Sequence, residues 1–146
     1  RVLTAYLKRA LEGLPPVVWG GHQIRDFIYV EDAVRCHRLC LIKKGLDFSI
    51  FNVSTGLGTS ISALADLISQ KFQLDKPIYE ELAEGEVSAE VQGRKRIPAE
   101  LKQMVLSNEE AKRVLEWEPE VQLSQGLDLE MDWLREHPDR WSEMSY

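Results

Sequence analysis

Arg25, which follows closely on a glycine pair, is the side chain whose type and position are best suited to chemistry. It lies in the stretch GGHQIRDFIYVEDAVR, residues 20–35. A guanidinium group presents paired donors to a phosphate or carboxylate and keeps its charge. Glycines just ahead of it allow the backbone to approach a ligand closely. The local pattern leaves two alternatives open: an anion site, or an ion pair of Arg25 with Asp26, Glu31 or Asp32.

A second candidate is the glycine-containing loop GLGTSI, residues 56–61, which we expect between a strand and a helix. A dinucleotide-binding loop would occupy that position, but its fingerprint requires a third glycine where this chain has Ile61. We therefore interpret the segment as a loop that leads into a helix. Phosphate binding at the N-terminus of that helix is a further possibility.

Local signatures of the common catalytic centres are missing from the sequence. There is no nucleophile elbow and no glutamate–histidine zinc helix, and the three histidines share no local constellation. None of the four tyrosines is followed by a lysine four residues later. We accordingly assign no catalytic residue and no bound cofactor to this chain.

Two cysteines, Cys36 and Cys40, flank His37, but further metal ligands at a recognisable spacing are missing. We expect free thiols, which suit a reducing cytosol, because the spacing is unfavourable for a disulfide. No apolar run approaches the length of a membrane span. The net charge of −6 argues against a nucleic-acid partner. These features predict a cytoplasmic protein with no metal, nucleic-acid or membrane partner.

Hydrophobic periodicity and turn residues predict an alternation of helices and short strands. An amphipathic helix ends at Gly13, and a later helix is expected to begin at a capping box formed by Ser107 and Glu110. Asp32 is also expected to cap a helix. Strands are predicted at 17–19, 25–30, 49–53 and 77–81, and the other helices at 31–44, at 61–72, and from Leu123 to a point before Pro138.

This order of elements predicts an α/β fold with few short strands and several packed helices. A length of 146 residues fits one domain, so we expect a single domain over residues 1–146, with an irregular loop at about 83–103. The strands are too few for a free-standing doubly wound sheet, and the first helix begins without a cap. We therefore expect a piece of something larger, with exposed apolar surface that favours association.

Four segments, in order, resemble those of the extended short-chain dehydrogenase/reductases that act as nucleotide-sugar epimerases, dehydratases and decarboxylases. The first resembles the family pattern G-x-G-x-Q-x-R-D-F/W/Y-I/L-Y/H-V-x-D, with a turn one residue shorter. FNVSTGLGTSISALADLI resembles N-x-G-x-G-x-x-x-S/T-I/V, with Ser54 where glycine is usual. SNEEAKRVLEWEP and LSQGLDLEMDWL resemble the two closing helices, with Glu116 replacing a glycine.

The resemblance implies that the chain is the C-terminal, substrate-binding portion of a Rossmann-type enzyme. In that family the segment before the R-D motif offers main chain and an aromatic side chain to the nucleotide base, and Val17 and Trp19 occupy those positions. The motif arginine, here Arg25, binds the diphosphate. A second arginine from the later loop meets the same group; by position this is Arg96, with Arg94 as the alternative.

The family performs hydride chemistry on NAD with a tyrosine and a lysine four residues later, and this chain has neither that pair nor the NAD loop. We therefore expect it to bind the diphosphate part of a UDP- or dTDP-sugar, and to need an N-terminal Rossmann half, or another chain, for isomerase or lyase chemistry resembling that of UDP-glucose 4-epimerase. The alternative is a non-catalytic, truncated remnant that acts as a structural or protein-interaction module, including by self-association.

Overall fold

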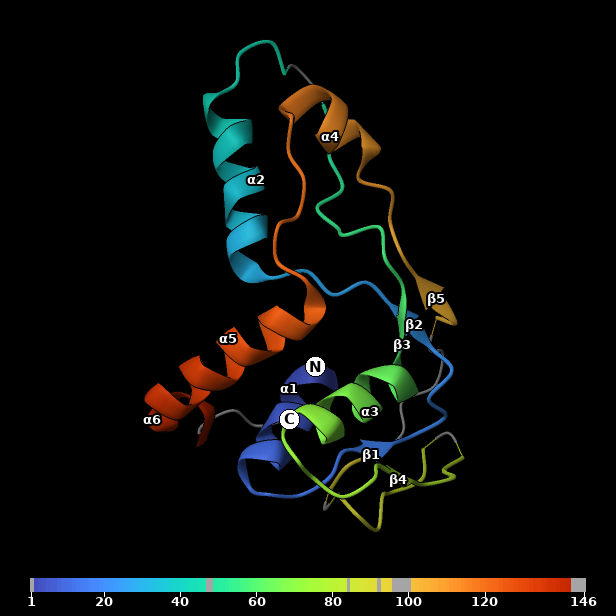
Figure 1. Cartoon of the computed structure of the whole chain (residues 1–146). Helices are drawn as coiled ribbons and strands as arrows, with labels where there is room; N and C mark the ends of the chain where they lie inside the picture. The colour runs from blue at the N-terminus through green and yellow to red at the C-terminus, as the bar shows by residue number, and fades with distance from the viewer. Residues whose placement is uncertain (1, 47–48, 84, 92, 96–100, 143–146) are drawn as a thin grey trace. The chain divides into compact units, whose positions relative to one another are not determined.

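The protein is described by a computed structural model that covers residues 2–46, 49–83, 85–91, 93–95 and 101–142. It has the expected α/β character, with short strands and several helices (Figure 1). The helices are α1 (Val2–Leu11), α2 (Val30–Ile42), α3 (Ile61–Lys71), α4 (Glu109–Leu115), α5 (Leu123–Glu136) and α6 (Pro138–Ser142). The strands are β1 (Val17–Val18), β2 (Ile24–Arg25), β3 (Thr59–Ser60), β4 (Ile78–Tyr79) and β5 (Gln103–Met104).

The chain divides into two compact units, each assembled from separate stretches of sequence. Unit 1 comprises Arg1–Gln23, Ser60–Lys102 and Leu127–Tyr146, and unit 2 comprises Ile24–Thr59 and Gln103–Gly126. Two compact units can belong to one domain, so the expected single domain stays a prediction.

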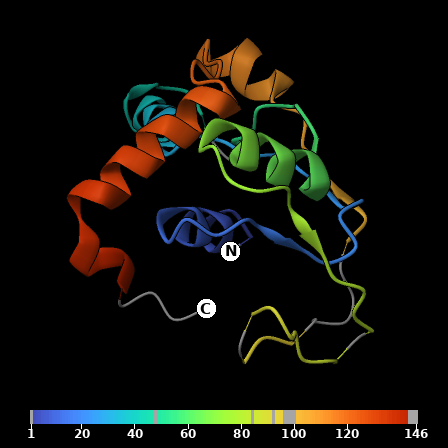
Figure 2. The ribbon, with the colours of Figure 1, turned by 60° about the horizontal axis from the view of Figure 1, so that its bottom comes forward.

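Unit 1 is built on the parallel pair β1–β4, with Val17 opposite Ile78 and Val18 opposite Tyr79. Helix α3 packs against α1 and against β1 (Figure 2). The apolar stripe predicted for this helix runs from Ile61 to Phe72. Its four residues from Ile61 to Ile68 are buried, and the fifth, Phe72, is half-buried just beyond the end of α3. They repeat at a spacing of three or four residues, which places them on one helical face. The buried side chains of the stripe are Ile61, Leu64, Ala65 and Ile68.

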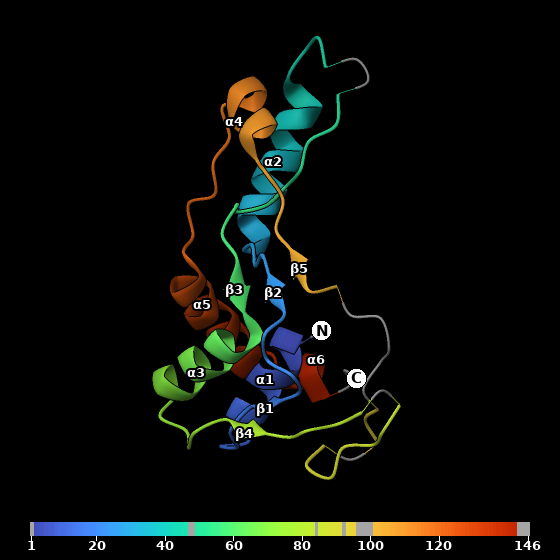
Figure 3. The same cartoon turned by 90° about the vertical axis from the view of Figure 1, so that its right-hand side faces the viewer.

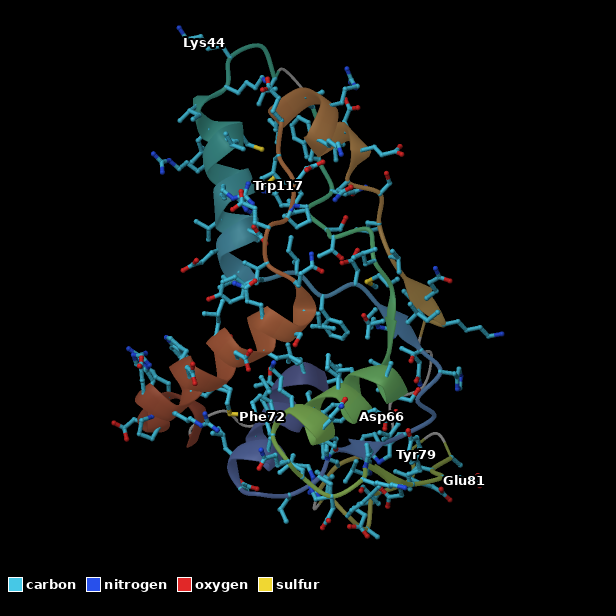
Figure 4. All side chains as sticks on the ribbon, viewed as in Figure 1. Lys44, Asp66, Phe72, Tyr79, Glu81 and Trp117 are labelled. Carbon is cyan, nitrogen blue, oxygen red and sulfur yellow. The ribbon has the colours of Figure 1, made fainter. Side chains whose placement is uncertain are left out.

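Unit 2 contains the parallel pair β2–β5, in which Arg25 lies opposite Met104. The sheet order is β3-β2-β5, and Figure 3 shows β2 between the other two strands. Its hydrophobic core lies where α2 meets α4 and the segment after it, around the fully buried Trp117 (Figure 4). The indole Nε1 of Trp117 donates to the main-chain carbonyl of Asp32 at 3.0 Å, which joins this core to the start of α2.

Two predicted strands differ from the structure. Residues 49–53 form no strand in the structure. In this segment Ile50 is 86% exposed, whereas Phe51 and Val53 pack against the unit 2 core. The prediction of a strand over 25–30 was too long, because the strand ends at Arg25. Beyond it, the side chain of Asp26 bonds to the loop at residues 55–56, and the chain enters α2 at Val30.

Neither predicted capping residue takes the N-cap position of its helix, although the Ser107 hydroxyl accepts from the main-chain amide of Glu109 at 3.3 Å. The N-cap of α4 is Asn108 rather than Ser107, and the side-chain Nδ2 of Asn108 donates to the main-chain carbonyl of Ser54 at 3.0 Å. Glu110, the expected second half of the capping box, instead pairs with Arg113. Asp32 lies inside the first turn of α2, and its carboxylate accepts hydrogen bonds from the main chain of a distant segment.

Candidate functional site

Trp19 lies directly after β1, and a carboxylate holds its indole. Nε1 of Trp19 donates to Oε2 of Glu80 at 2.9 Å, and the Trp19 side chain is half-buried. Glu80 directly follows β4, the strand paired with β1. The strand pairing of unit 1 therefore brings together two residues that are 61 positions apart.

Val17 is a core residue by its side chain, which is buried. The carbonyls of Pro16 and Val18 accept from the amides of Ile78 and Glu80. Because successive residues of a strand direct their polar main-chain groups to opposite sides, those of Val17 face away from β4. A role for Val17 in binding would therefore be a main-chain role.

The Glu80 carboxylate gathers further donors from the segment that follows β4. Oε2 accepts from the Ser88 hydroxyl at 2.5 Å, and Oε1 accepts from the Ala89 amide at 2.7 Å. The hydrogen bond from Ser88 is the main cause that lowers the pKa of Glu80; partial desolvation opposes it, and the donors from Ala89 and Trp19 reinforce it. Glu80 is therefore ionised at neutral pH, and it is bonded both to Trp19 after β1 and to Ser88 and Ala89 in the segment after β4.

A cavity of about 560 Å³ lies beside this network in unit 1. Val18 and Gly20 line it on the β1 side, and residues 79–83 line the other side. Figure 4 labels two of these residues, Tyr79 and Glu81, on the stretch around the end of β4. The lining contains two carboxylates, those of Glu80 and Glu81, so the cavity is better suited to hydrogen-bond donors than to a phosphate.

Arg94 lies where the chain turns back on itself within the predicted irregular loop. The described part of this loop is drawn in yellow in Figure 2. Its main-chain carbonyl accepts from the Ser88 amide at 2.8 Å, and Val87 and Lys95 form an antiparallel bridge. The backbone that carries Arg94 is thus joined through Ser88 to Glu80. Arg96, the other arginine predicted for the diphosphate, lies outside the described residues.

Arg25 is half-buried in β2, and its Nη1 donates to the carbonyl of Ile24 at 2.9 Å. Two of the acids considered as its ion-pair partners hold other groups: Asp26 accepts from Thr55 and Gly56, while Asp32 pairs with Arg35. Arg25 belongs to unit 2, whereas Val17, Trp19 and Arg94 belong to unit 1. Their convergence on one ligand stays a prediction.

The GLGTSI loop does not have the geometry of a phosphate-binding loop. The amides of Thr55 and Gly56 donate to the Asp26 carboxylate at 3.0 and 2.9 Å. At the start of α3, the amides of Ile61, Ser62 and Ala63 donate to the carbonyls of Gln23 and Gly21 and to the Ser60 hydroxyl, respectively. Because these donors are used within the protein, the structure supports a loop leading into a helix and argues against phosphate binding there.

Sequence reasoning missed the roles of Glu80 and Asp26. Glu80 was placed only within the strand predicted at 77–81, and Asp26 was considered as a possible partner of Arg25. No local signal points to Glu80, because its indole partner is distant in sequence. The family motif does carry a signal for Asp26, since an aspartate follows the arginine in it.

The remaining sequence features have structural explanations. Cys36 is buried in the unit 2 core and Cys40 is half-buried, both as free thiols. Among the described residues, no group of three or more potential metal ligands comes together. Within the same part of the chain, no helix combines the length and the apolar character needed to cross a membrane.

Comparison with known proteins gives a consistent result. The family model described as GDP-mannose 4,6 dehydratase matches residues 1–129. A putative UDP-glucose 4-epimerase of Methanocaldococcus jannaschii is 29% identical over 136 residues, which is 92% of this chain and 39% of that protein. The chain thus spans about two fifths of the length of this relative.

Solved structures show the same fold. The UDP-glucose 4-epimerase of Thermotoga maritima, solved with UDP-glucose, has a TM-score of 0.77 at 28% identity over 94% of this chain and 40% of its own. A UDP-glucuronic acid 4-epimerase variant of Bacillus cereus, bound to UDP-4-deoxy-4-fluoro-glucuronic acid and NAD, has a TM-score of 0.76 at 25% identity, over 93% of this chain and 40% of its own.

These matches confirm the expected fold, that of the C-terminal part of such enzymes. The chain belongs to the GDP-mannose 4,6 dehydratase family, and with it to the nucleotide-sugar epimerases and dehydratases among the extended short-chain dehydrogenase/reductases.

Proposed function

We propose that this chain binds the nucleotide diphosphate part of a nucleotide sugar, as the substrate half of a cytoplasmic NAD-dependent epimerase or dehydratase. The observation that carries the proposal is the half-buried indole of Trp19, held by Glu80, which itself lines a cavity of about 560 Å³ together with Val18 and Gly20. It occupies the position where the family resemblance calls for an aromatic face against the base. UDP-sugars bound in the two solved relatives support the substrate class.

The proposed roles follow from the chemistry of the ligand. An aromatic face and main-chain hydrogen bonds suit a nucleotide base, and Trp19 and the main chain of Val17 offer them. A diphosphate carries two charges that guanidinium groups neutralise with charge-assisted hydrogen bonds. We assign this role to Arg25 together with Arg96 or Arg94. Binding energy gathered on the nucleotide can orient the sugar at a reacting centre elsewhere.

NAD does not fit the glycine loop of this chain, because the amides of Thr55 and Gly56 are already bonded to Asp26. The proposed parent reaction, oxidation of the sugar at C4 followed by epimerisation, dehydration or decarboxylation, is assigned to a Rossmann half that would supply the cofactor.

Titration of the full chain with UDP-glucose and dTDP-glucose, followed by tryptophan fluorescence and calorimetry, tests the proposal. We expect millimolar or tighter binding that Arg25→Ala weakens about 10- to 150-fold, the equivalent of losing a charge-assisted hydrogen bond. Arg38→Ala, an exposed site on α2 with the same change of charge, is the matched control and should leave binding within about twofold. Folded protein that binds neither nucleotide contradicts the proposal.

A specific observation favours the alternative, an interaction module. Helix α2 carries apolar residues on two opposite faces: Cys36 and Leu39 pack into the unit 2 core, while Val30, Val34 and Leu41 are exposed. A helix that is apolar on both faces is usually buried on both. The exposed face suits a second copy of this chain or a Rossmann half.

Sedimentation velocity separates these possibilities. For self-association we expect a concentration-dependent dimer that Leu41→Glu abolishes, and Leu41, 86% exposed here, can be changed without disturbing the core. A wild-type chain that stays monomeric at high concentration contradicts self-association and leaves a separate Rossmann half as the partner to test by co-expression.

A further inference from the structure

We propose that Glu80 is a positioning residue that holds the indole of Trp19 and, through Ser88, the backbone of Arg94, so that the proposed base-binding face and the segment that carries Arg94 are ordered together. The inference rests on the proposed nucleotide-binding function and extends it to a residue outside the family motifs identified in the sequence. Glu80 acts through its neighbours and needs no contact with the ligand.

The first arm of this arrangement is the bond between the indole and Glu80. The donor–acceptor distance from Trp19 Nε1 to Glu80 Oε2 is 2.9 Å, which is the usual length of a strong hydrogen bond. The backbone positions from which the two side chains extend are also fixed, because the Glu80 amide donates to the Val18 carbonyl at 3.1 Å. An indole held at its nitrogen cannot turn about its side-chain torsions without losing a bond to a charged acceptor.

The second arm runs from Glu80 through Ser88 to Arg94. The buried Ser88 donates its hydroxyl to Glu80 and its amide to the carbonyl of Arg94, at 2.5 and 2.8 Å. Its hydroxyl also accepts from the Val91 amide at 2.9 Å, which closes the turn between Ser88 and Arg94. One carboxylate therefore orders the segment that carries Arg94.

Electrostatics favours this indirect role over direct binding. A carboxylate next to a diphosphate repels it. The charge of Glu80 is distributed over hydrogen bonds from Trp19, Ser88 and Ala89, so Glu80 orders cationic and aromatic groups at a limited cost in repulsion. Ordering one side chain before binding changes affinity by about three- to tenfold.

Binding of UDP-glucose to wild type, Glu80→Ala, Glu80→Gln, Trp19→Phe and the double variant Trp19→Phe/Glu80→Ala tests the inference. We expect Glu80→Ala to weaken binding about three- to tenfold, and Glu80→Gln, which keeps one acceptor oxygen, to recover part of the loss. The losses of Trp19→Phe and Glu80→Ala should fail to multiply in the double variant, because phenylalanine has no N–H for Glu80 to hold. Glu90→Ala, an exposed acid of the same segment, is the charge-matched control.

A spectroscopic readout needs no ligand. In ¹⁵N-labelled protein the indole N–H signal of Trp19, assigned by its loss in Trp19→Phe, should shift and exchange faster in Glu80→Ala but not in Glu90→Ala. Circular dichroism verifies that each variant is folded. If Glu80→Ala does not fold, the same measurements are made on Glu80→Gln.

The outcomes separate the inference from the proposed function. If wild type binds UDP-glucose, and Glu80→Ala and Glu80→Gln bind it equally tightly, the positioning role is wrong and the proposed function stands. Losses that multiply fully in the double variant also overturn the inference. If wild type binds no UDP-glucose although the indole signal depends on Glu80, the proposed function fails, and the role of Glu80 in binding fails with it.

Discussion

Replacing Asp32 with asparagine tests how much one buried carboxylate contributes to unit 2. Asp32 is 2% exposed. Its oxygens accept from the amides of Glu120 and Val121 at 3.0 and 2.9 Å and from Nη2 of Arg35 at 2.5 Å. Asparagine has nearly the same shape, but it offers one acceptor oxygen and turns an NH₂ group toward donors.

The expected loss follows from these bonds. A hydrogen bond to a charged group contributes about 1.5–3 kcal/mol, and a buried donor left without an acceptor costs about 1–3 kcal/mol. We expect Asp32→Asn to lower the free energy of unfolding by about 2–3 kcal/mol. Asp32→Ala should lower it by about 3–5 kcal/mol, because it removes every acceptor from Arg35 and the two amides.

Urea unfolding of the full chain at neutral pH, followed by circular dichroism, measures these differences. Glu31→Gln, a neighbouring exposed acid in the first turn of α2, is the control and should change the free energy by less than about 0.5 kcal/mol. A folded Asp32→Asn protein with the stability of Glu31→Gln would refute the reasoning that these bonds stabilise the unit.

The pH dependence gives an independent check. Burial by itself raises the pKa of Asp32, but hydrogen bonds from Val121, Glu120 and Arg35 outweigh it, so the net pKa is lowered. A carboxyl whose pKa is lower in the folded state stabilises the fold above its unfolded pKa, which is about 3.9. The stability difference between wild type and Asp32→Asn should therefore be largest above about pH 5 and shrink as the pH falls through the folded pKa.

Two further predictions concern packing and thiol chemistry. Gly58→Ala should lower the free energy of unfolding by about 1–3 kcal/mol in a urea titration, because a Cβ there would lie 2.6 Å from a methyl carbon of Ile24. Gly126 is the control, because it lies in helix α5 and a Cβ there would meet its nearest atom, on the Tyr29 ring, at 3.6 Å. Gly126→Ala should leave the free energy of unfolding unchanged or raise it by up to about 1 kcal/mol. Equal losses at both sites would contradict the packing argument. In native protein at neutral pH, Ellman's reagent should modify Cys40 before Cys36, because burial raises the pKa of the Cys36 thiol and limits access to it; faster modification of Cys36, as read by peptide mapping, would argue against that burial.

The features that the sequence determined by itself are either local to one segment or follow from motifs that occur in a fixed order. The stripe of α3 from Ile61 to Ile68 was predictable because helical periodicity belongs to the segment itself. The family was predictable because four motifs occur in order along one chain. The α/β class followed from the alternation of helices and short strands.

Tertiary structure decided which polar groups meet. Ser107 and Glu110 have the spacing of a capping box, yet Asn108 takes the cap position and bonds to the carbonyl of Ser54, 54 residues away. Asp32 was expected to cap a helix, but it holds the amides of Glu120 and Val121 instead. Hydrogen-bond partners separated by more than 50 residues leave no periodic trace in either segment, so sequence patterns could not reveal them.

The same reason explains the candidate site. Trp19 could be singled out from its place before the R-D motif, but its partner Glu80 could not, because the parallel pairing of β1 with β4 brings them together. Segment 49–53 shows the reverse case: its apolar residues predicted a strand, but in the structure Ile50 is exposed and Phe51 and Val53 pack against the unit 2 core without forming one. Local preference sets what a segment can form, and the energy of long-range pairing sets what it does form.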